Sequence, residues 1–429
     1  MSNRHIAPTP PLGWNSYDSY GCAINEQEFR ATVDVMAEKL LPAGYRYACI
    51  DGMWAFEPEA MGPTMWKPEA QPHMDAYGRL VPSPRRFPSA KEGSFAPLAD
   101  YVHSKGLKFG IHVMRGVPRK AVDRRLPVLG TRFTTEDIAD KNSTSDWDNT
   151  MYGLNTRHAG AQACYDSILA LYAQWGVDFI KADDMGTPYA AAEIELFASA
   201  VERCGRPIVL SLSPGVWLDD ILRAWPHVAQ HCQMWRITAD MWDSWPCIKQ
   251  LFPLCAAWSG AIGENSWPDA DMLPYGRLSL KSAKTPGGRP TRLTNDEIRS
   301  HFSLLCMCRS PLLMGGDLLS LDDFTLSVLT DAEVLAVNQH SRQNRMVFSN
   351  VSGLEGWTAR MDDGDVVVAF FNMADTPQEY TSKLRWLRIE EGHYAVRDLW
   401  EKKDLPPIEE RISGMLAPHA CVMCRLKKI

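Results

Sequence analysis

The 429-residue sequence predicts an α/β fold, a (β/α)8 TIM barrel followed by a small C-terminal antiparallel β-sandwich domain. Two observations lead to this prediction. Runs typical of buried strands alternate with helical patterns eight times before residue 338, in units of about 30–45 residues. After that point long helices stop, and short β runs separated by turn signals follow. We therefore expect a catalytic barrel over residues 1–338 and a β domain over residues 339–429.

Each expected strand is a short run of β-branched or aromatic residues bounded by turn residues. The barrel strands are expected within 9–16, 45–51, 107–113, 178–180, 207–213, 233–237, a stub beside 267–273, and 310–314. Helical periodicity and a capping box predict helices at 25–41, 95–105, 159–175, 190–204, 218–225, 244–257 and 294–308. Residues 53–94 and 114–153 fit neither pattern and are expected to be long loops. The β domain should contain strands at 345–348, 354–361, 365–371, 393–398 and 420–426.

Composition limits the partners and the location of the protein. The net charge is −7 and no basic stripe is visible, which argues against a nucleic-acid partner. No run of about 18 apolar residues is present for a membrane span. The N-terminal stretch lacks the apolar region of a signal peptide, so we predict a cytoplasmic protein. The eleven cysteines are scattered singly, as is typical of free thiols in a reducing compartment. The oligomeric state stays open, with a homo-oligomer as one alternative.

Ionisable and polar residues recur at the expected carboxyl ends of the barrel strands, where side chains converge on one mouth. They are Asp51, His112, Lys181 with Asp183, Ser213, Arg236 with Asp240, and Asp269 with Asp271. Any one of them could be a helix cap, a core histidine or a loop anchor. Several carboxylates facing one pocket, without a metal-type histidine set or a glycine-rich phosphate loop, favour glycoside hydrolysis. The fifteen tryptophans agree with sugar binding but are also ordinary core residues.

Two of these carboxylates have environments that suit the two roles in this chemistry. Asp183 follows Lys181 on the same face of a strand, and a neighbouring cation favours the ionised form that a nucleophile needs. Asp240 lies among Trp235, Trp242 and Trp245 in the sequence. Apolar walls would favour its protonated form, which an acid catalyst needs.

Six ordered segments make the chain resemble glycoside hydrolase family 27, the family of α-galactosidases and α-N-acetylgalactosaminidases. They are GWNSYDSYGC, AGYRYACID, LKFGIH, WGVDFIKADD, MWRITADMWDSW and WPDADML, with AVNQ at 336–339 where the family's barrel gives way to its β domain. The resemblance covers the whole chain. It implies a retaining double displacement without a metal or an organic cofactor.

The resemblance also implies a role for each matching residue. The nucleophile falls on Asp183 and the acid/base on Asp240, with Arg236 beside it. The implied sugar contacts are Trp14, Asp51, Trp54, His112 (in place of the family's tyrosine), Lys181, Ser213, Arg236 and Asp271.

Several positions depart from the family pattern. Gly52 and Met53 stand where the family commonly has Asp and Cys. The carboxylate that usually helps hold the sugar's 4- and 6-hydroxyls is therefore missing, as is a disulfide partner for Cys22. Ser213 replaces a glutamate, as in members that accept a 2-acetamido group, although Val216 would crowd an acetyl group. The long loops, with Trp66 in the first and Trp147 and Asp148 in the second, are expected to rebuild the pocket wall.

We therefore predict a retaining exo-acting α-glycosidase that acts on terminal α-linked galactose-type sugars. Three alternatives stay open. The specificity could be a related one such as β-L-arabinopyranosidase, the barrel could bind carbohydrate without catalysis, or the enzyme could act as a transglycosidase.

Overall fold

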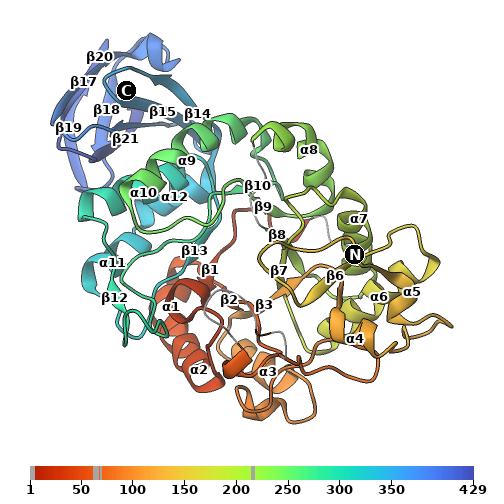
Figure 1. The fold of residues 1–429 in the computed structure, drawn as a ribbon. Coiled ribbons are helices and arrows are strands. Elements are labelled where there is room, and N and C mark those ends of the chain that lie inside the picture. The colour runs from red at the N-terminus through yellow and green to blue at the C-terminus, as the bar shows by residue number, and fades with distance from the viewer. Residues whose placement is uncertain (1–4, 61–66, 68–69, 214–217) are drawn as a thin grey trace.

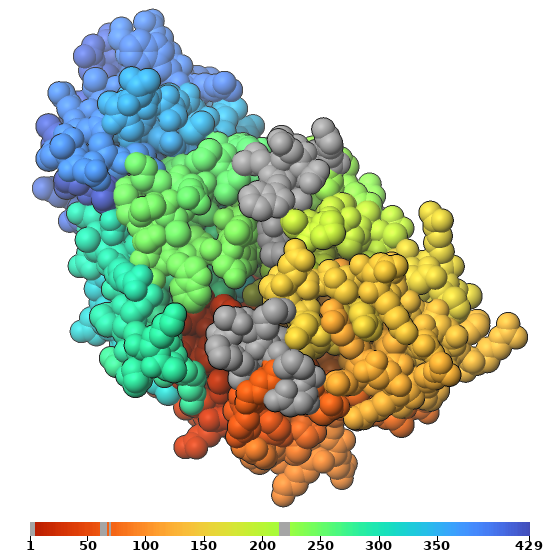
Figure 2. Space-filling view, viewed as in Figure 1, coloured from red at the N-terminus to blue at the C-terminus, as the bar shows by residue number. Residues whose placement is uncertain are grey.

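The computed structural model describes residues 5–60, 67, 70–213 and 218–429 (Figure 1). A barrel of parallel strands surrounded by helices forms the larger part. The C-terminal strands form a separate sheet region beside helices α9, α10 and α12. In the space-filling view this region protrudes from one side of the barrel (Figure 2).

The barrel sheet contains eight strands, which confirms the predicted fold class. They are β1 (Leu12–Asn15), β2 (Tyr47–Ile50), β3 (Lys108–Met114), β7 (Phe179–Asp183), β8 (Val209–Leu212), β9 (Met234–Arg236), β10 (Trp267–Asp269) and β13 (Leu312–Met314). From β1 to β10 each strand pairs in parallel with the next one in this series, and β13 pairs in parallel with β1. The remaining gap, between β10 and β13, is bridged by Leu273. Its N–H donates to Leu313 at 2.8 Å, and its carbonyl accepts from Gly315 at 3.0 Å.

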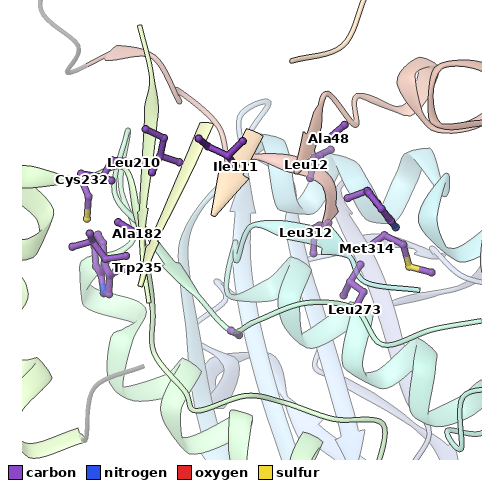
Figure 3. Packing of buried hydrophobic residues seen from close by; sticks show 14 of the residues in the cluster. Leu12, Ala48, Ile111, Ala182, Leu210, Cys232, Trp235, Leu273, Leu312 and Met314 are labelled. Atoms are coloured by element: carbon purple, nitrogen blue, oxygen red, sulfur yellow. The ribbon is translucent and has the colours of Figure 1, made fainter. Parts of the chain in front are cut away.

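Side chains alternate between the two faces of each barrel strand, as the period of a strand requires. On β7, Ile180 and Ala182 face the helices and join the large outer core, whereas Phe179 joins the small cluster inside the barrel. Figure 3 shows two parts of the outer core: Leu210 and Trp235 lie beside Ala182, and Leu312 and Met314 lie beside Leu273. Because Lys181 and Asp183 share the face of Phe179, they point into the barrel above its apolar floor.

The helices that cover the barrel match most of the predicted ones. They are α2 (Glu26–Val35), α3 (Ala96–Ser104), α6 (Ala159–Gln174), α7 (Ala191–Arg203), α8 (Leu218–His231), α9 (Trp245–Trp258), α10 (Asn295–Met307), α11 (Asp323–Leu329) and α12 (Ala332–His340), with α1 (Tyr17–Tyr20) after β1. The predicted capping box of Thr294 and Glu297 is present at the start of α10. The predicted end of α8 at Trp225 is wrong, because the helix accommodates Pro226 and continues. The sequence analysis also missed α11 and α12.

The segment after β3 is more ordered than predicted. The expected loop 114–153 contains β4 (Val117–Pro118), α4 (Arg119–Asp123), α5 (Thr135–Ile138), β5 (Ala139–Asp140) and β6 (Met151–Leu154). Strands β4, β6 and β5 form a small sheet. These elements are two to five residues long, too short to produce a detectable period in the sequence.

The C-terminal region is built from antiparallel strands, as predicted. One sheet contains β14 (Ser341–Ser349), β15 (Leu354–Met361), β16 (Val366–Asn372), β21 (Cys421–Lys428), β18 (Tyr394–Asp398) and β19 (Lys403–Ile408), and a second contains β17 (Gln378–Lys383) and β20 (Arg411–Leu416). The sequence analysis missed β17, β19 and β20. The division of the chain at residue 338 stays a prediction.

All eleven cysteines are free thiols. Within the described ranges, we find no helix with both the length and the apolar character needed to cross a membrane.

Candidate active site

The polar side chains that end β2, β3 and β7 meet inside the barrel. Parallel register sets His112 on β3 directly beside Lys181 on β7. The Lys181 ammonium lies 3.0 Å from Asp51 Oδ2, and His112 Nε2 lies 2.8 Å from Asp183 Oδ2. Asn15, at the end of β1, donates to the same Asp51 oxygen at 2.8 Å. Four neighbouring strands thus contribute one cluster of alternating charges.

The charges in this cluster hold Asp183 in its ionised form. Burial alone would raise the pKa of Asp183, but the His112 hydrogen bond and the Lys181 charge outweigh it and leave the pKa below its usual value. Burial alone would lower the pKa values of Lys181 and His112, because it disfavours the charged form of a base. In both cases the carboxylates of Asp51 and Asp183 prevail and hold these pKa values above the usual range. The outcome is a carboxylate that is hydrogen-bonded to His112 and stabilised as an anion by the charge of Lys181.

The backbone after β7 also fixes the orientation of Asp183. Asp184 has a φ of 64°, in the left-handed region, and its N–H donates to Asp183 Oδ1 at 2.8 Å. Buried Arg115 holds the Asp184 side chain through a 2.9 Å ion pair with Oδ2. Arg115 also reaches Glu193 on α7 at 3.1 Å, so the strand end is tied to a helix. Both oxygens of Asp183 therefore have defined partners before any ligand enters.

A second cluster forms at the ends of β9 and β10. Arg236, whose side chain is only 3% exposed, lies 2.8 Å from Asp271 and 3.3 Å from Asp240. The Asp240 side chain is 63% exposed. Its predicted enclosure by tryptophans is wrong: Trp235 packs on Trp258 and Trp245 stacks on His419, both away from the carboxylate. Asp240 instead faces water, with a guanidinium as its neighbour.

Asp271 belongs to the wall of this second cluster. Its φ is 79°, and its Oδ2 accepts from the Met241 N–H at 2.7 Å, so it anchors the segment that carries Asp240. Burial raises the pKa of Asp271 although Arg236 opposes the shift. Burial also raises the pKa of the neighbouring Asp269 to about 6. Arg236 and these acids form a rigid base from which the Asp240 carboxylate projects.

Every residue expected to contact sugar is buried except Lys181, which is half-buried. Trp14, Trp54 and Ser213 have their described contacts outside the charged clusters. Trp14 has no exposed surface, its indole N–H donates to Gly316 at 2.8 Å, and its rings pack on Tyr20 and Phe29. Trp54 is 2% exposed and its indole N–H donates to the His112 carbonyl at 2.7 Å. Ser213, 1% exposed, ends β8 with its N–H bonded to Ala182. The indoles of Trp14 and Trp54 therefore pack behind the barrel mouth and support it. Trp66 and Val216 lie outside the described residues.

Two residues in this region were not predicted. Asn15 orients Asp51, as described above. The Tyr17 ring lies beside Lys181, with the ammonium 5.9 Å from the ring centroid. Asn15 ends the first strand and Tyr17 lies two residues beyond it, so the rule that polar residues gather at strand ends could have found them. Tyr17 also lines a cleft of about 350 Å³ next to the mouth, together with Cys22, Met53 and Trp242.

The ionisable groups of the mouth are carboxylates that each lie beside a basic side chain. Within the part of the chain that is described, no three His, Cys, Asp or Glu side chains come together as metal ligands. The arrangement offers a buried carboxylate anion, a solvent-accessible carboxylate on a neighbouring wall, and several hydrogen-bonding groups between them. These are the groups that a two-carboxylate displacement at a sugar carbon uses.

Comparison with known proteins identifies the family. The family model described as α-galactosidase A matches residues 9–122 and 150–340, and the model for the α-galactosidase C-terminal β-sandwich domain matches residues 351–426. An α-galactosidase of Cyamopsis tetragonoloba is 29% identical over 99% of this chain and 87% of its own length.

Solved structures agree with this result. A GH27 β-L-arabinopyranosidase from Geobacillus stearothermophilus is 43% identical, with a TM-score of 0.93 over 98% of this chain and 97% of that one. A Bacillus halodurans protein assigned provisionally as an α-N-acetylgalactosaminidase is 39% identical, with a TM-score of 0.88 over 100% of this chain and 99% of that one. The match of the family model to more than half of the sequence shows that the chain belongs to the α-galactosidase A family and is a glycoside hydrolase of family 27.

Proposed function

We propose that the protein is a retaining exo-glycosidase that hydrolyses terminal α-linked galactose-type sugars, as an α-galactosidase or an α-N-acetylgalactosaminidase. The observation that carries the proposal is the Asp183 carboxylate, buried in the mouth and kept ionised between His112 and Lys181. A buried anion with prepositioned partners is what attack on an anomeric carbon requires. The relatives named α-galactosidase and α-N-acetylgalactosaminidase support the choice of sugar.

In the first step, an oxygen of Asp183 attacks the anomeric carbon while Asp240 gives its proton to the glycosidic oxygen. The bond to the leaving group breaks, and a covalent glycosyl–enzyme forms with inverted configuration. The exposure of Asp240 suits this role, because the leaving group has to approach it from solvent.

In the second step, ionised Asp240 takes a proton from a water molecule, whose oxygen attacks the anomeric carbon. The bond to Asp183 breaks and the sugar leaves with its original configuration. Lys181 and Asp51 are positioned to bind ring hydroxyls, since both are fixed at the carboxyl ends of strands next to Asp183. Arg236 and Asp271 would form the opposite wall of the sugar site.

A β-L-arabinopyranosidase is the second candidate function. β-L-Arabinopyranose has the ring of α-galactose without the hydroxymethyl group, so the same two carboxylates would serve both sugars. The 43% identity to the Geobacillus stearothermophilus enzyme favours this candidate. Gly52 adds no side chain beside Asp51, and a Cβ there would lie 3.5 Å from the His112 ring, so residue 52 leaves room for either sugar.

The proposal is tested by measuring kcat/KM on the p-nitrophenyl α-galactoside, α-N-acetylgalactosaminide and β-L-arabinopyranoside. We expect turnover of at least one, and NMR should detect the product first in the anomeric configuration of the substrate. Background rates on all three, together with binding of the monosaccharides, would favour a non-catalytic sugar-binding barrel. Oligosaccharide products at high substrate concentration would identify a transglycosidase.

Substitutions separate the roles of the two carboxylates. Asp183→Asn should abolish turnover of every substrate. Asp240→Ala should lose most activity on substrates with poor leaving groups but retain it on a dinitrophenyl glycoside, because that leaving group needs no proton. Azide should restore turnover of Asp240→Ala and yield a glycosyl azide of retained configuration. An active Asp183→Asn, or equal losses by Asp240→Ala on all leaving groups, contradicts the assignment.

A further inference from the structure

We propose that Asp148 is a sugar-binding residue, whose buried Oδ2 accepts a hydrogen bond from a hydroxyl of the sugar held in the barrel mouth. This inference rests on the proposed function, because it concerns the substrate of the same site.

The first observation is an incompletely bonded, buried carboxylate. The Asp148 side chain has no exposed surface. Its Oδ1 accepts from the Thr150 N–H at 2.6 Å, whereas its Oδ2 finds no hydrogen-bond partner in the described structure. Removing a charged oxygen from water without giving it a partner is costly, so an orphaned oxygen of this kind is rare and usually has a functional reason. Burial raises the pKa of Asp148, in agreement with this lack of partners.

The second observation is the location of Asp148. Asp148 accepts from the Thr150 N–H at 2.6 Å, and Thr150 lines a small cavity together with His112. A Cβ built on Gly52 would lie 3.5 Å from the His112 ring and 3.8 Å from Cys22 Sγ. The segment that carries Asp148 therefore reaches the side of the mouth where Gly52 faces the His112 ring. His112 in turn contacts the Asp183 carboxylate.

The third observation is that the segment around Asp148 is held in place. The Asp148 N–H donates to Ser145 Oγ at 3.3 Å, and Arg115 donates to Ser143 Oγ at 2.9 Å. Thr150, two residues further on, lines a small cavity together with His112. The same Arg115 binds Asp184 beside the nucleophile, so one guanidinium ties the two segments together. A preorganised acceptor loses little entropy when a ligand binds.

The fourth observation concerns the origin of this segment. The family model matches residues 9–122 and resumes at 150, so Asp148 lies in a stretch outside the shared family sequence. The same loop carries the small sheet of β4, β5 and β6. This chain thus brings a carboxylate toward the sugar site from a segment that the family model does not match, on the side where Gly52 lies two residues after β2.

The test compares Asp148→Asn with Asp146→Asn, an exposed aspartate of the same loop. On the glycoside that the wild-type enzyme hydrolyses best, Asp148→Asn should lower kcat/KM by about 10- to 100-fold, as expected for a hydrogen bond to a charged group. The control should stay within about twofold. The midpoint of thermal unfolding of Asp148→Asn should stay the same or rise, because the variant keeps an acceptor for Thr150 and removes a poorly solvated charge.

Monodeoxy analogues of the same glycoside supply the readout that a structural role would not change. One analogue, lacking the hydroxyl that Asp148 binds, should be hydrolysed equally well by the wild type and by Asp148→Asn. Equal losses on every analogue, a lowered unfolding midpoint, or an unchanged kcat/KM on the parent glycoside would each overturn the proposal.

A crystal structure of the wild-type protein soaked with the monosaccharide tests the contact without any variant. We expect a sugar hydroxyl within hydrogen-bond distance of Asp148 Oδ2, and a bound sugar that leaves this oxygen uncontacted would refute the inference. Failure of the proposed function is distinguishable, since it would appear as a wild-type enzyme that hydrolyses no glycoside, whereas the soaked crystal still reports on Asp148.

Discussion

His112 has the clearest residue-scale consequence, because it is hydrogen-bonded to Asp183 and lowers the pKa of that carboxyl group. The His112→Asn substitution removes the imidazole whose hydrogen bond and charge lower the pKa of Asp183, so that pKa should rise from its lowered value. A nucleophile must be ionised, and the acidic limb of the kcat/KM profile reports ionisation in the free enzyme. We therefore expect this limb to move to higher pH in the variant.

A second histidine–aspartate pair offers a matched control. His103 contacts Asp178 at 2.7 Å at the amino end of the same strand, at the opposite end of β7 from Asp183. His103→Asn should leave the acidic limb where it is in the wild type. An unmoved limb in His112→Asn would mean that Lys181 and the backbone suffice to keep Asp183 ionised.

Residue-scale prediction from sequence succeeded where a side chain follows directly from its place on a strand. The sequence predicts Asp51, His112, Lys181 and Asp183 at strand ends, and strand alternation and register bring them together. It failed for the surroundings of Asp240. Three tryptophans near Asp240 in the sequence suggested an apolar pocket. Closeness in sequence does not determine where side chains point, and Trp235 and Trp245 pack on other residues. Trp14 likewise packs behind the mouth.

At the scale of the element, strand β16 serves two cores with its two faces. Val367, Ala369 and Phe371 belong to the core that includes the barrel helices, whereas Val368 and Phe370 fill the interior of the β-sandwich. Phe371 meets Phe252 of α9 edge to face, with ring centroids 5.0 Å apart. The strand therefore links the sandwich to the barrel through alternate side chains.

Removal of the Phe371 ring tests this link. Phe371→Ala should lower the free energy of unfolding by about 3–5 kcal/mol, because it leaves a cavity between the sheet and α9. Trp386→Ala, which truncates a 60% exposed ring in the same region, should change stability by less than about 0.5 kcal/mol. Denaturant titration measures both values, and equal effects of the two substitutions would contradict the shared core.

Elements were predictable from sequence where a local pattern marks them. Helices α6 and α10 show a clear period or a capping box, and the buried barrel strands show continuous apolar runs. The short elements after β3 carry no such signal, and β19, with Pro406 and Pro407, resembles a loop. Pro226 suggested a helix end, yet α8 continues through it, because tertiary packing can compensate for one missing hydrogen bond.

On the scale of the whole molecule, polar and aromatic contacts join the barrel to the C-terminal sheets. Trp245 of α9 stacks on His419 at 4.4 Å, Ser300 of α10 donates to the His419 carbonyl at 2.6 Å, and the Trp400 indole donates to Ser303 at 2.8 Å. Together with the shared core, these contacts couple the two parts.

Coupling of this kind predicts one cooperative unfolding transition in calorimetry for the full chain. Residues 1–338 expressed alone should aggregate or fail to fold, since the apolar faces of α9 and α10 would be exposed to water. Two well-separated calorimetric transitions, or a stable barrel fragment, would show that the parts fold independently.

The joint at Leu273 affects how the barrel fluctuates. Every other pair of neighbouring barrel strands is joined by a ladder of backbone hydrogen bonds. The gap between β10 and β13 is closed by the two backbone hydrogen bonds of Leu273. Opening two such bonds costs only about 1–3 kcal/mol. Amide protons at Leu273 and Gly315 should therefore exchange with deuterium sooner than those along β2, β3 and β7. The barrel should open most readily at this joint, one residue beyond Met272 and two beyond Asp271, on the wall that supports Asp240.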